Sequence, residues 1–328
     1  MTKIRLWIKY TRNISLPQSL LPALLAVSCA AVADHSTTSL FASHDFSYDF
    51  SWELALLAVI GVAAAHLGMN LADDYFDYKN QVVEKTPVLD DDSIRHRMGK
   101  CHYITSGSAT LRDLRNAIIV FLAIAVACGL IIFICRGWTI LILMTLGAIL
   151  GLSYSGGPLK LSFRGYGELV IGLLFGPLLM IGVQFAACSV IDWNIILIST
   201  CVGLLVTNIL YTHSVIDADN DEKLQKMSFA RLLRSNKAQL IATIIFTITP
   251  FVIITLGTAL GWWHWSYIFA IVTLPLALYI IRSIKRFLSG DHSVNSQLLC
   301  HCGTRSHYLT MSFCLVIIIA NIIERFTI

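Results

Sequence analysis

The stretch NLADDYFDYKN, residues 70–80, stands where an apolar run of about twenty residues gives way to a long charged segment. On a helix, its polar residues fall at i, i+3, i+4 and i+7, which is one face: Asn70, Asp73, Asp74 and Asp77. Carboxylates crowded on one face repel each other unless a positive charge lies between them. Magnesium suits that position, because it binds carboxylate oxygens and keeps its remaining places for water and phosphate. The pattern predicts the three aspartates as metal ligands and Asn70 as a substrate-binding neighbour.

A second acidic pair follows a later apolar run, in the stretch HSVIDADND at residues 213–221. Asp217 and Asp221 are again i and i+4, about 6 Å apart along a helix axis at ~1.5 Å per residue. Either acidic stripe alone is equally explained as a solvated helix end. Two of them at membrane edges favour function, because intramembrane carboxylates are costly. Together they predict a site that holds a diphosphate through magnesium ions bound by both motifs.

The composition is that of a membrane protein. Charged residues make up 13% of the chain and apolar residues 56%, whereas soluble domains carry about 25% charged residues. The sequence predicts an all-α polytopic membrane protein, with one domain over residues 1–328 and no nucleic-acid partner. The segments long and apolar enough to span a bilayer are 14–34, 52–73, 113–135, 138–155, 166–189, 194–216, 238–260, 264–283 and 307–326.

The basic residues predict an orientation for these about nine transmembrane helices. With the N-terminus in the cytoplasm, all of the 24 Lys and Arg residues except Arg136 and Arg325 fall in inner segments. An excess of Lys and Arg marks cytoplasmic loops. We therefore expect a multi-pass protein of the cytoplasmic (inner) membrane. Both acidic motifs then lie at cytoplasmic helix ends beside basic loops.

Three segments resemble the UbiA-type intramembrane prenyltransferases: NLADDYFDYKN, HSVIDADND, and GLSYSGGPLKLSFRGYGELVIGLLFGPLLMIG at 151–182. The 1,4-dihydroxy-2-naphthoate prenyltransferases of menaquinone synthesis are the branch that the chain resembles most. Their first helix is similar to WIKYTRNISLPQSLLPALLA at 7–26. The resemblance implies a nine-helix bundle around a central cavity open to lipid. It also implies that the acidic motifs bind magnesium and the diphosphate of an isoprenoid donor.

The reaction that this resemblance implies is transfer of a polyprenyl group from a prenyl diphosphate to 1,4-dihydroxy-2-naphthoate. The allylic carbon–oxygen bond ionises, the electron-rich ring attacks the cation, and the ring loses its carboxylate. The chain departs from the branch at Asp73-Asp74, where Asn-Asp is usual. It also has His213, Ser214 and Ile216 where the branch has Asn-Asn and an Arg. These departures leave another acceptor open, such as 4-hydroxybenzoate.

Further site residues follow from what prenyl transfer requires. Lys100, Lys160 and Arg164 are candidates for the diphosphate oxygens, and the last two are equally explained as membrane-edge anchors. Tyr154 and Tyr211 offer ring faces to a carbocation. Catalytic roles are predicted for Asp77, Asp217 and His213, with Asp217 or His213 orienting or deprotonating the acceptor. A hydrogen-bonded core histidine is the alternative for His213.

A cation-coupled transporter is the competing class, because its intramembrane acids would bind the transported ion. Transporter acids lie near the bilayer midplane, often at broken helices. The two motifs here lie at helix ends next to basic loops, which favours the enzyme.

Overall fold

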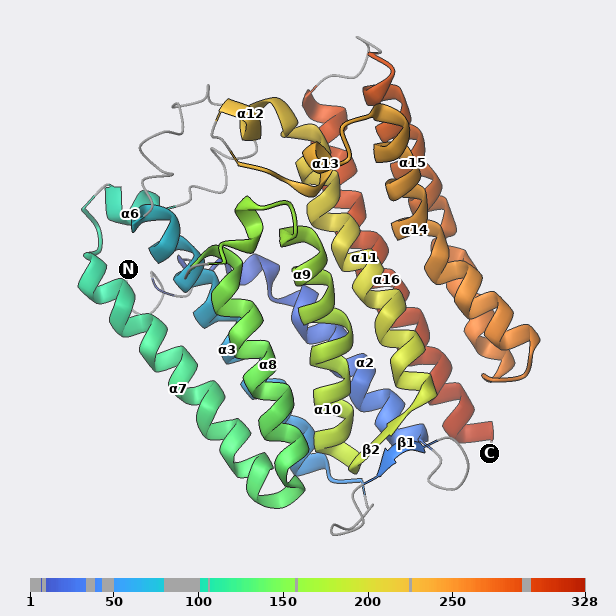
Figure 1. The fold of residues 1–328 in the computed structure, drawn as a ribbon. Coiled ribbons are helices and arrows are strands. Elements are labelled where there is room, and N and C mark those ends of the chain that lie inside the picture. The colour runs from blue at the N-terminus through green and yellow to red at the C-terminus, as the bar shows by residue number, and fades with distance from the viewer. Residues whose placement is uncertain are drawn as a thin grey trace.

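A computed structural model gives the three-dimensional structure of the chain. Nine of the described helical segments are long and apolar enough to cross a membrane, and they stand side by side as a bundle (Figure 1). The predicted all-α polytopic architecture is confirmed. The structure describes residues 7, 10–33, 39–42, 50–79, 101–105, 107–156, 159–223, 226–290 and 296–327.

The membrane-spanning segments follow one another along the chain, and some combine two or three helical stretches. They are η1 (Asn13–Ser15) with α2 (Pro17–Val32), α3 (Trp52–Lys79), α7 (Leu111–Arg136), α8 (Trp138–Ser155), α9 (Gly167–Leu173) with η3 (Leu174–Leu178) and α10 (Leu179–Cys188), α11 (Trp193–Ile216), α14 (Asn236–Ala259), η4 (Trp265–Thr273) with α15 (Leu274–Leu288), and α16 (Ser296–Thr327).

Short elements lie at the two ends of this bundle (Figure 1). One end carries α6 (His102–Thr105), η2 (Leu161–Phe163), α12 (Ala218–Lys223) and α13 (Phe229–Leu232). At the opposite end, β1 (Ser39–Ala42) pairs antiparallel with β2 (Val190–Asp192).

The ninth span begins earlier than hydropathy predicts, at Ser296 rather than at residue 307. The added turns carry polar residues that face the bundle, such as Ser306, which is fully buried and accepts a hydrogen bond from Asn208 at 3.3 Å. Arg305 was expected in an inner loop. It lies on α16 instead, with its guanidinium 3.8 Å from the ring centroid of Tyr279. A hydropathy window ends at such residues, whereas the helix continues through them.

The fifth span contains a π-helical turn, η3, which accommodates Pro177 and its missing N–H donor. This span lies against α11 with almost no space between the backbones. A Cβ atom on Gly176 would lie 2.5 Å from the Cα of Gly203. Small residues permit this approach, and it brings the start of α9 beside the end of α11.

The first and last spans also pack together. On α2 and α16, Asn321 Nδ2 donates to Ser28 Oγ at 2.8 Å, and the side chains of Gln18 and His307 are hydrogen-bonded. The two terminal helices thus close the bundle.

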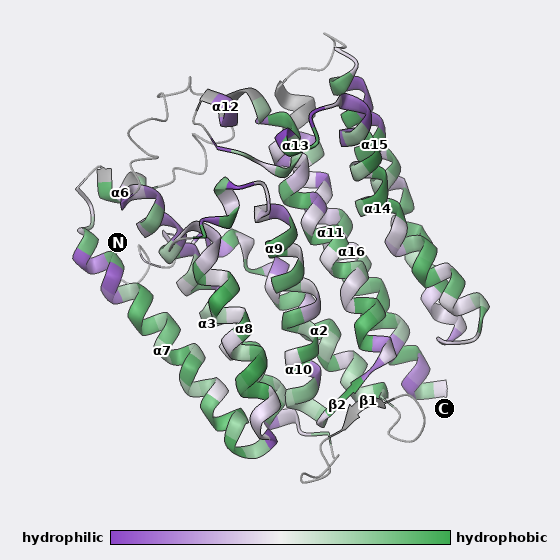
Figure 2. Cartoon of the chain, viewed as in Figure 1, coloured by the Kyte–Doolittle hydropathy of each residue, from purple (hydrophilic) through white to green (hydrophobic). Residues whose placement is uncertain are grey.

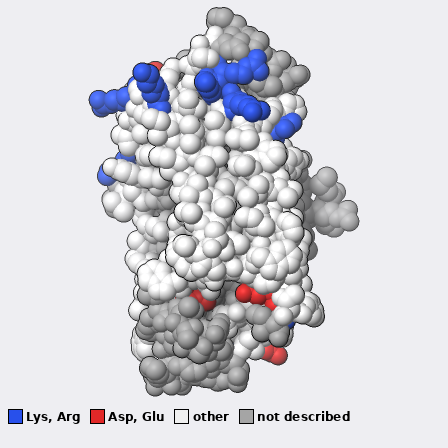
Figure 3. All heavy atoms as spheres, turned by 90° about the vertical axis from the view of Figure 1, so that its right-hand side faces the viewer, with Lys and Arg blue, Asp and Glu red and all other residues white. Residues whose placement is uncertain are grey.

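Apolar, polar and basic residues are distributed unevenly along the length of the bundle. Apolar residues fill the middle of the helices and polar residues gather near their ends (Figure 2). Figure 3 shows Lys and Arg side chains gathered at one end of the molecule. Exposed basic residues there belong to α14, α15 and the turn before α14: Arg234, Lys237, Arg282, Lys285 and Arg286. This is the end that carries α12 and α13.

Candidate functional site

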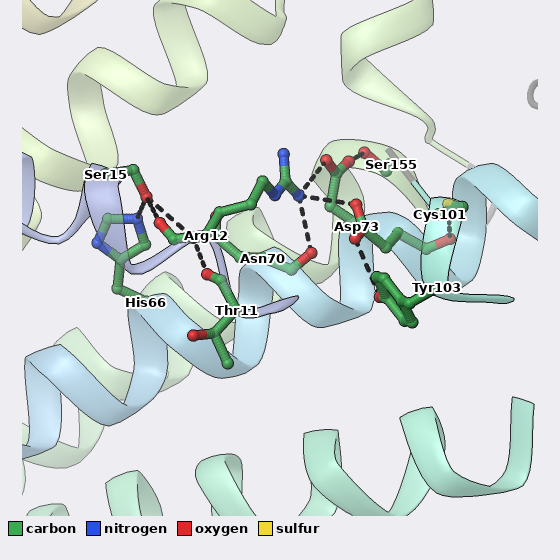
Figure 4. Close-up of polar contacts among 10 residues, drawn as sticks. Thr11, Arg12, Ser15, His66, Asn70, Asp73, Cys101, Tyr103 and Ser155 are labelled. Carbon is green, nitrogen blue, oxygen red and sulfur yellow. Dashed lines mark hydrogen bonds and ion pairs between the residues drawn. The ribbon is translucent and has the colours of Figure 1, made fainter. Parts of the chain in front are cut away.

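The first acidic motif occupies the last turns of α3, which continues as a helix through Lys79. Its carboxylates meet the guanidinium of Arg12 (Figure 4). Arg12 Nη2 donates to Asp73 Oδ2 at 3.1 Å and to Asp74 Oδ1 at 3.0 Å. The same nitrogen donates to the backbone oxygen of Asn70 at 2.8 Å. A charge of the chain itself therefore lies between the two aspartates.

Burial works against the charge of Arg12, but the attraction of Asp74 and Asp73 outweighs it. The pKa of the guanidinium consequently stands above its ordinary value. Arg12 has a φ of 54°, in the left-handed region. A non-glycine residue there is strained, and the ion pairs with Asp73 and Asp74 help to hold it.

The other carboxylate oxygens of Asp73 and Asp74 also have protein partners (Figure 4). Tyr103 donates its hydroxyl to Asp74 Oδ2 at 3.0 Å, and Ser155 donates its hydroxyl to Asp73 Oδ1. Burial and then the charge of Asp74 raise the pKa of the Tyr103 hydroxyl, so it keeps its proton and donates. Asp77 is buried one turn further along α3. Asp73 and Asp74 are thus fixed by partners from three other segments.

Asn70 fastens the segment before α2 to α3. Its Nδ2 donates to the backbone oxygen of Thr11 and to Ser15 Oγ, each at 3.1 Å. The ring of His66 continues this chain, with Nε2 at 3.2 Å from Ser15 Oγ and Nδ1 at 2.7 Å from Ser19 Oγ. This polar network places Arg12 over the acidic turns of α3.

The second acidic motif spans the junction of α11 and α12. Asp217 caps α11, and the N–H of Asp221 donates to the backbone oxygen of Asp217 at 2.9 Å. The helical i to i+4 spacing therefore survives the junction, as predicted. Asp221 is 1% exposed, and Lys226 Nζ lies 3.7 Å from its Oδ1. A cation from the same short segment thus faces this carboxylate.

A cavity of about 180 Å³ opens beside this second motif. Four of its lining residues lie on one face of α11 and its cap, at i, i+3, i+4 and i+7: Leu210, His213, Ser214 and Asp217. The full lining is Tyr154, Ser162, Gly167, Glu168, Leu210, His213, Ser214, Asp217, Asp221 and Lys226.

The end of α8 connects the two motifs. Tyr154 lines the cavity beside Asp217 and Asp221, while the next residue, Ser155, donates to Asp73 on α3. Two neighbouring residues therefore link the cavity of the second motif to the carboxylates of the first.

The structure brings some of the predicted catalytic and substrate-binding residues into the cavity and leaves others out. Tyr154 and His213 line it. Tyr211 does not: it is fully buried, and its hydroxyl donates to the backbone oxygen of Gln239 at 2.9 Å. Counting back from Asp217 in helical steps gives the cavity face, and Tyr211 falls off that face.

Among the described residues, Lys160 and Arg164 do not line the cavity. Arg164 is exposed, and its backbone pairs with that of Met227. Lys100 lies outside the described residues.

Several residues that the sequence analysis does not single out lie at the candidate site. By sequence, Arg12 is only one of the many basic residues of the inner side, and Tyr103 lies in a segment without periodicity. Lys226 is close enough to Asp221 in the sequence for an ion pair between the two to be expected. Glu168 gave the clearest signal, because a carboxylate within an apolar span is costly unless it serves a purpose.

The donor chemistry of the motifs fits magnesium. The described residues contain no preformed cluster of three or more His, Cys, Asp or Glu side chains that could enclose a metal. Magnesium does not need one, because it uses one or two carboxylates and completes its shell with water and phosphate. Carboxylate oxygens that accept hydrogen bonds keep further lone pairs, and ligating carboxylates are normally hydrogen-bonded by outer partners. Arg12, Tyr103 and Ser155 have the character of such partners.

Comparisons with known proteins show which family and which fold the chain shares. The chain is 25% identical over 293 residues, 88% of its length, to the 1,4-dihydroxy-2-naphthoate octaprenyltransferase of Mycobacterium tuberculosis, of which it covers 89%. Its fold is similar to that of a UbiA homologue from Archaeoglobus fulgidus solved with GPP and Mg²⁺, with a TM-score of 0.57 and 15% identity, covering 95% of this chain and 99% of that one. An apo UbiA homologue from Aeropyrum pernix gives a TM-score of 0.60 at 18% identity, covering 99% and 100%. Residues 19–301 match the UbiA prenyltransferase family, and the chain therefore belongs to that family.

Proposed function

We propose that this membrane protein transfers a polyprenyl group from a prenyl diphosphate to 1,4-dihydroxy-2-naphthoate, with loss of the acceptor's carboxylate. The observation that carries the proposal is at the end of α8, where Tyr154 lines the cavity that Asp217 and Asp221 also line and Ser155 donates to Asp73 of the other acidic motif. The names of relatives such as the mycobacterial octaprenyltransferase support the choice of acceptor.

The charged residues would hold the diphosphate end of the donor. Asp217 and Asp221 on one side and Asp73, Asp74 and Asp77 on the other are the proposed magnesium ligands. Bound magnesium would neutralise the diphosphate and stabilise it as a leaving group. Lys226 offers a further cation beside Asp221, and Lys100, Lys160 and Arg164 remain candidates for phosphate oxygens.

The cavity residues would handle the reacting carbons. When the allylic carbon–oxygen bond breaks, its electron pair leaves with pyrophosphate. The electron-rich ring of the acceptor then attacks the allylic cation that remains. The face of Tyr154 can stabilise that cation, and Leu210 contributes apolar wall. His213 lies in the same cavity, where it can position or accept the proton of an acceptor hydroxyl.

The proposed orientation follows the charges. Basic side chains gather at the end that carries α12 and α13 (Figure 3), as expected for a cytoplasmic face. We propose that the N-terminus and the site face the cytoplasm, in the inner membrane of the cell.

The test uses purified protein in lipid nanodiscs with magnesium, a radiolabelled prenyl diphosphate and a panel of aromatic acceptors that includes dihydroxynaphthoate and 4-hydroxybenzoate. A lipid-soluble prenylated naphthoquinol, identified by mass spectrometry, is the expected product. A product from 4-hydroxybenzoate alone would show that the acceptor is hydroxybenzoate and not dihydroxynaphthoate. No product from any acceptor, together with cation flux in liposomes, would show that the protein is a transporter and not a prenyltransferase.

A further inference from the structure

Glu168 is a buried carboxylate that the proposed donor chemistry does not use. It lies at the start of α9, is 4% exposed, and lines the same cavity as His213, Asp217 and Asp221. Burying a charge in this position is costly unless hydrogen bonds or a ligand compensate it.

One oxygen of Glu168 is fully engaged. Ser214 Oγ, on α11, donates to Oε1 at 2.5 Å, and the backbone N–H of Phe229, on α13, donates to the same oxygen at 3.0 Å. These donors come from two different elements, so they fix the carboxylate in place. The close packing of the fifth span against α11 keeps Glu168 and Ser214 next to each other.

The other oxygen is the one left for a ligand. Within the described part of the chain, both hydrogen bonds of Glu168 go to Oε1 and none to Oε2. A fixed carboxylate oxygen beside a cavity is a strong acceptor for a hydroxyl group, because hydrogen bonds to charged groups exceed neutral ones. Its negative charge also repels a second carboxylate.

We propose that Glu168 binds the aromatic acceptor through the ring hydroxyl that lies away from the acceptor's own carboxylate. This inference rests on the proposed function and deepens it. In 1,4-dihydroxy-2-naphthoate the hydroxyl concerned is the one at position 4. Glu168 thus selects acceptors that carry a hydroxyl remote from the carboxylate, and it orients the ring within the cavity.

The test compares Glu168→Gln with the wild type in direct binding. The glutamine carbonyl can still accept from Ser214 and Phe229, so its NH₂ group, a donor, takes the place of Oε2. The Kd for dihydroxynaphthoate, measured by calorimetry in nanodiscs, should rise about 10- to 100-fold. The KM for the prenyl diphosphate and the magnesium requirement should stay within about 2-fold of wild type, because this contact is made to the acceptor alone.

A second ligand sharpens the result. 1-Hydroxy-2-naphthoate lacks the hydroxyl at position 4, so the wild type should bind it about 10- to 100-fold more weakly than dihydroxynaphthoate. Glu168→Gln should bind the two alike. The matched control is Glu53→Gln, which changes an exposed glutamate at the other end of α3 and should leave both affinities unchanged.

Two outcomes overturn this role. An unchanged Kd with a lowered melting temperature would make Glu168 a structural tie between α11 and α13. A raised magnesium requirement or prenyl diphosphate KM would make it a metal ligand. If the wild type binds neither naphthoate and prenylates no aromatic acceptor, the proposed function itself fails.

Discussion

The two acidic motifs share their helical spacing and differ in what surrounds them. On α3, the oxygens of Asp73 and Asp74 accept hydrogen bonds from Arg12, Tyr103 and Ser155. At the junction of α11 and α12, Asp217 and Asp221 line a cavity. The first motif is therefore held by donors from three remote segments, whereas the second faces a cavity and pairs with Lys226 of its own short segment. The same spacing does not reveal this difference, because the partners come from remote segments.

The largest effect is expected for Asp74→Ala, which should remove both turnover and stability. It leaves the partly buried charge of Arg12 with Asp73 as its remaining hydrogen-bonded carboxylate and deprives Tyr103 of its acceptor. Breaking a buried ion pair costs about 3–5 kcal/mol. Melting of the purified variant should show this loss, beside an absence of product. Asp113→Ala is the control, since it removes an exposed carboxylate that accepts from Thr110 in the capping box of α7 and should cost about 1 kcal/mol without loss of turnover. An inactive Asp74→Ala variant that melts like the wild type would contradict the inference that the α3 motif also stabilises the fold.

Asp217→Ala should lower turnover on the order of 1,000-fold and leave melting nearly unchanged, because it removes a proposed metal ligand at a cavity. Product formation at saturating donor, with melting measured in parallel, gives the answer. Asp192→Asn is the matched control at the other end of α11, where Asp192 Oδ1 caps the helix by accepting from the N–H of Ile195 at 2.8 Å. Substantial turnover of Asp217→Ala at ordinary magnesium concentrations would contradict its assignment.

Tyr103→Phe tests the outer partners of the α3 motif alone. The variant keeps the ring in its stack with Tyr10, at 4.3 Å between centroids, and removes the hydroxyl that donates to Asp74. A buried acceptor left without its donor costs about 1–3 kcal/mol, and we expect turnover to fall about 10-fold. Tyr308→Phe, at an exposed position, should change neither quantity. Unchanged melting and turnover in Tyr103→Phe would show that the hydroxyl does not hold Asp74.

The smallest effect is expected for Lys226→Met. Lys226 is partly exposed and lies 3.7 Å from Asp221, so solvent screens its charge. The KM for the prenyl diphosphate should rise about 3- to 5-fold, with a weaker dependence on ionic strength than in wild type. Lys226→Arg should keep the wild-type KM. An equal rise in both variants would mean that packing rather than charge matters at this position.

Much of the fold could be predicted from the sequence, because the bilayer requires long apolar helices and these stand out in the chain. Boundaries failed where polar side chains face the bundle, as at Ser306 on α16. The acidic motifs and His213 could be found because helical periodicity is local. Arg12 and Tyr103 could not, since only the packed bundle brings them to α3. Periodicity counted back from Asp217 would have excluded Tyr211 from the cavity.

The seam between α2 and α16 has a consequence for how the protein is made. The polar groups of Gln18 and Ser28 enter the membrane with the first helix, yet their partners His307 and Asn321 are synthesised only after the seven described spans that lie between them. Until α16 has been made, these groups face lipid or other helices, at an energetic cost. The bundle can therefore close only once α16 has entered the membrane. A nascent chain that stops short of α16 would expose unsatisfied polar groups, a mark by which membrane quality control can recognise it.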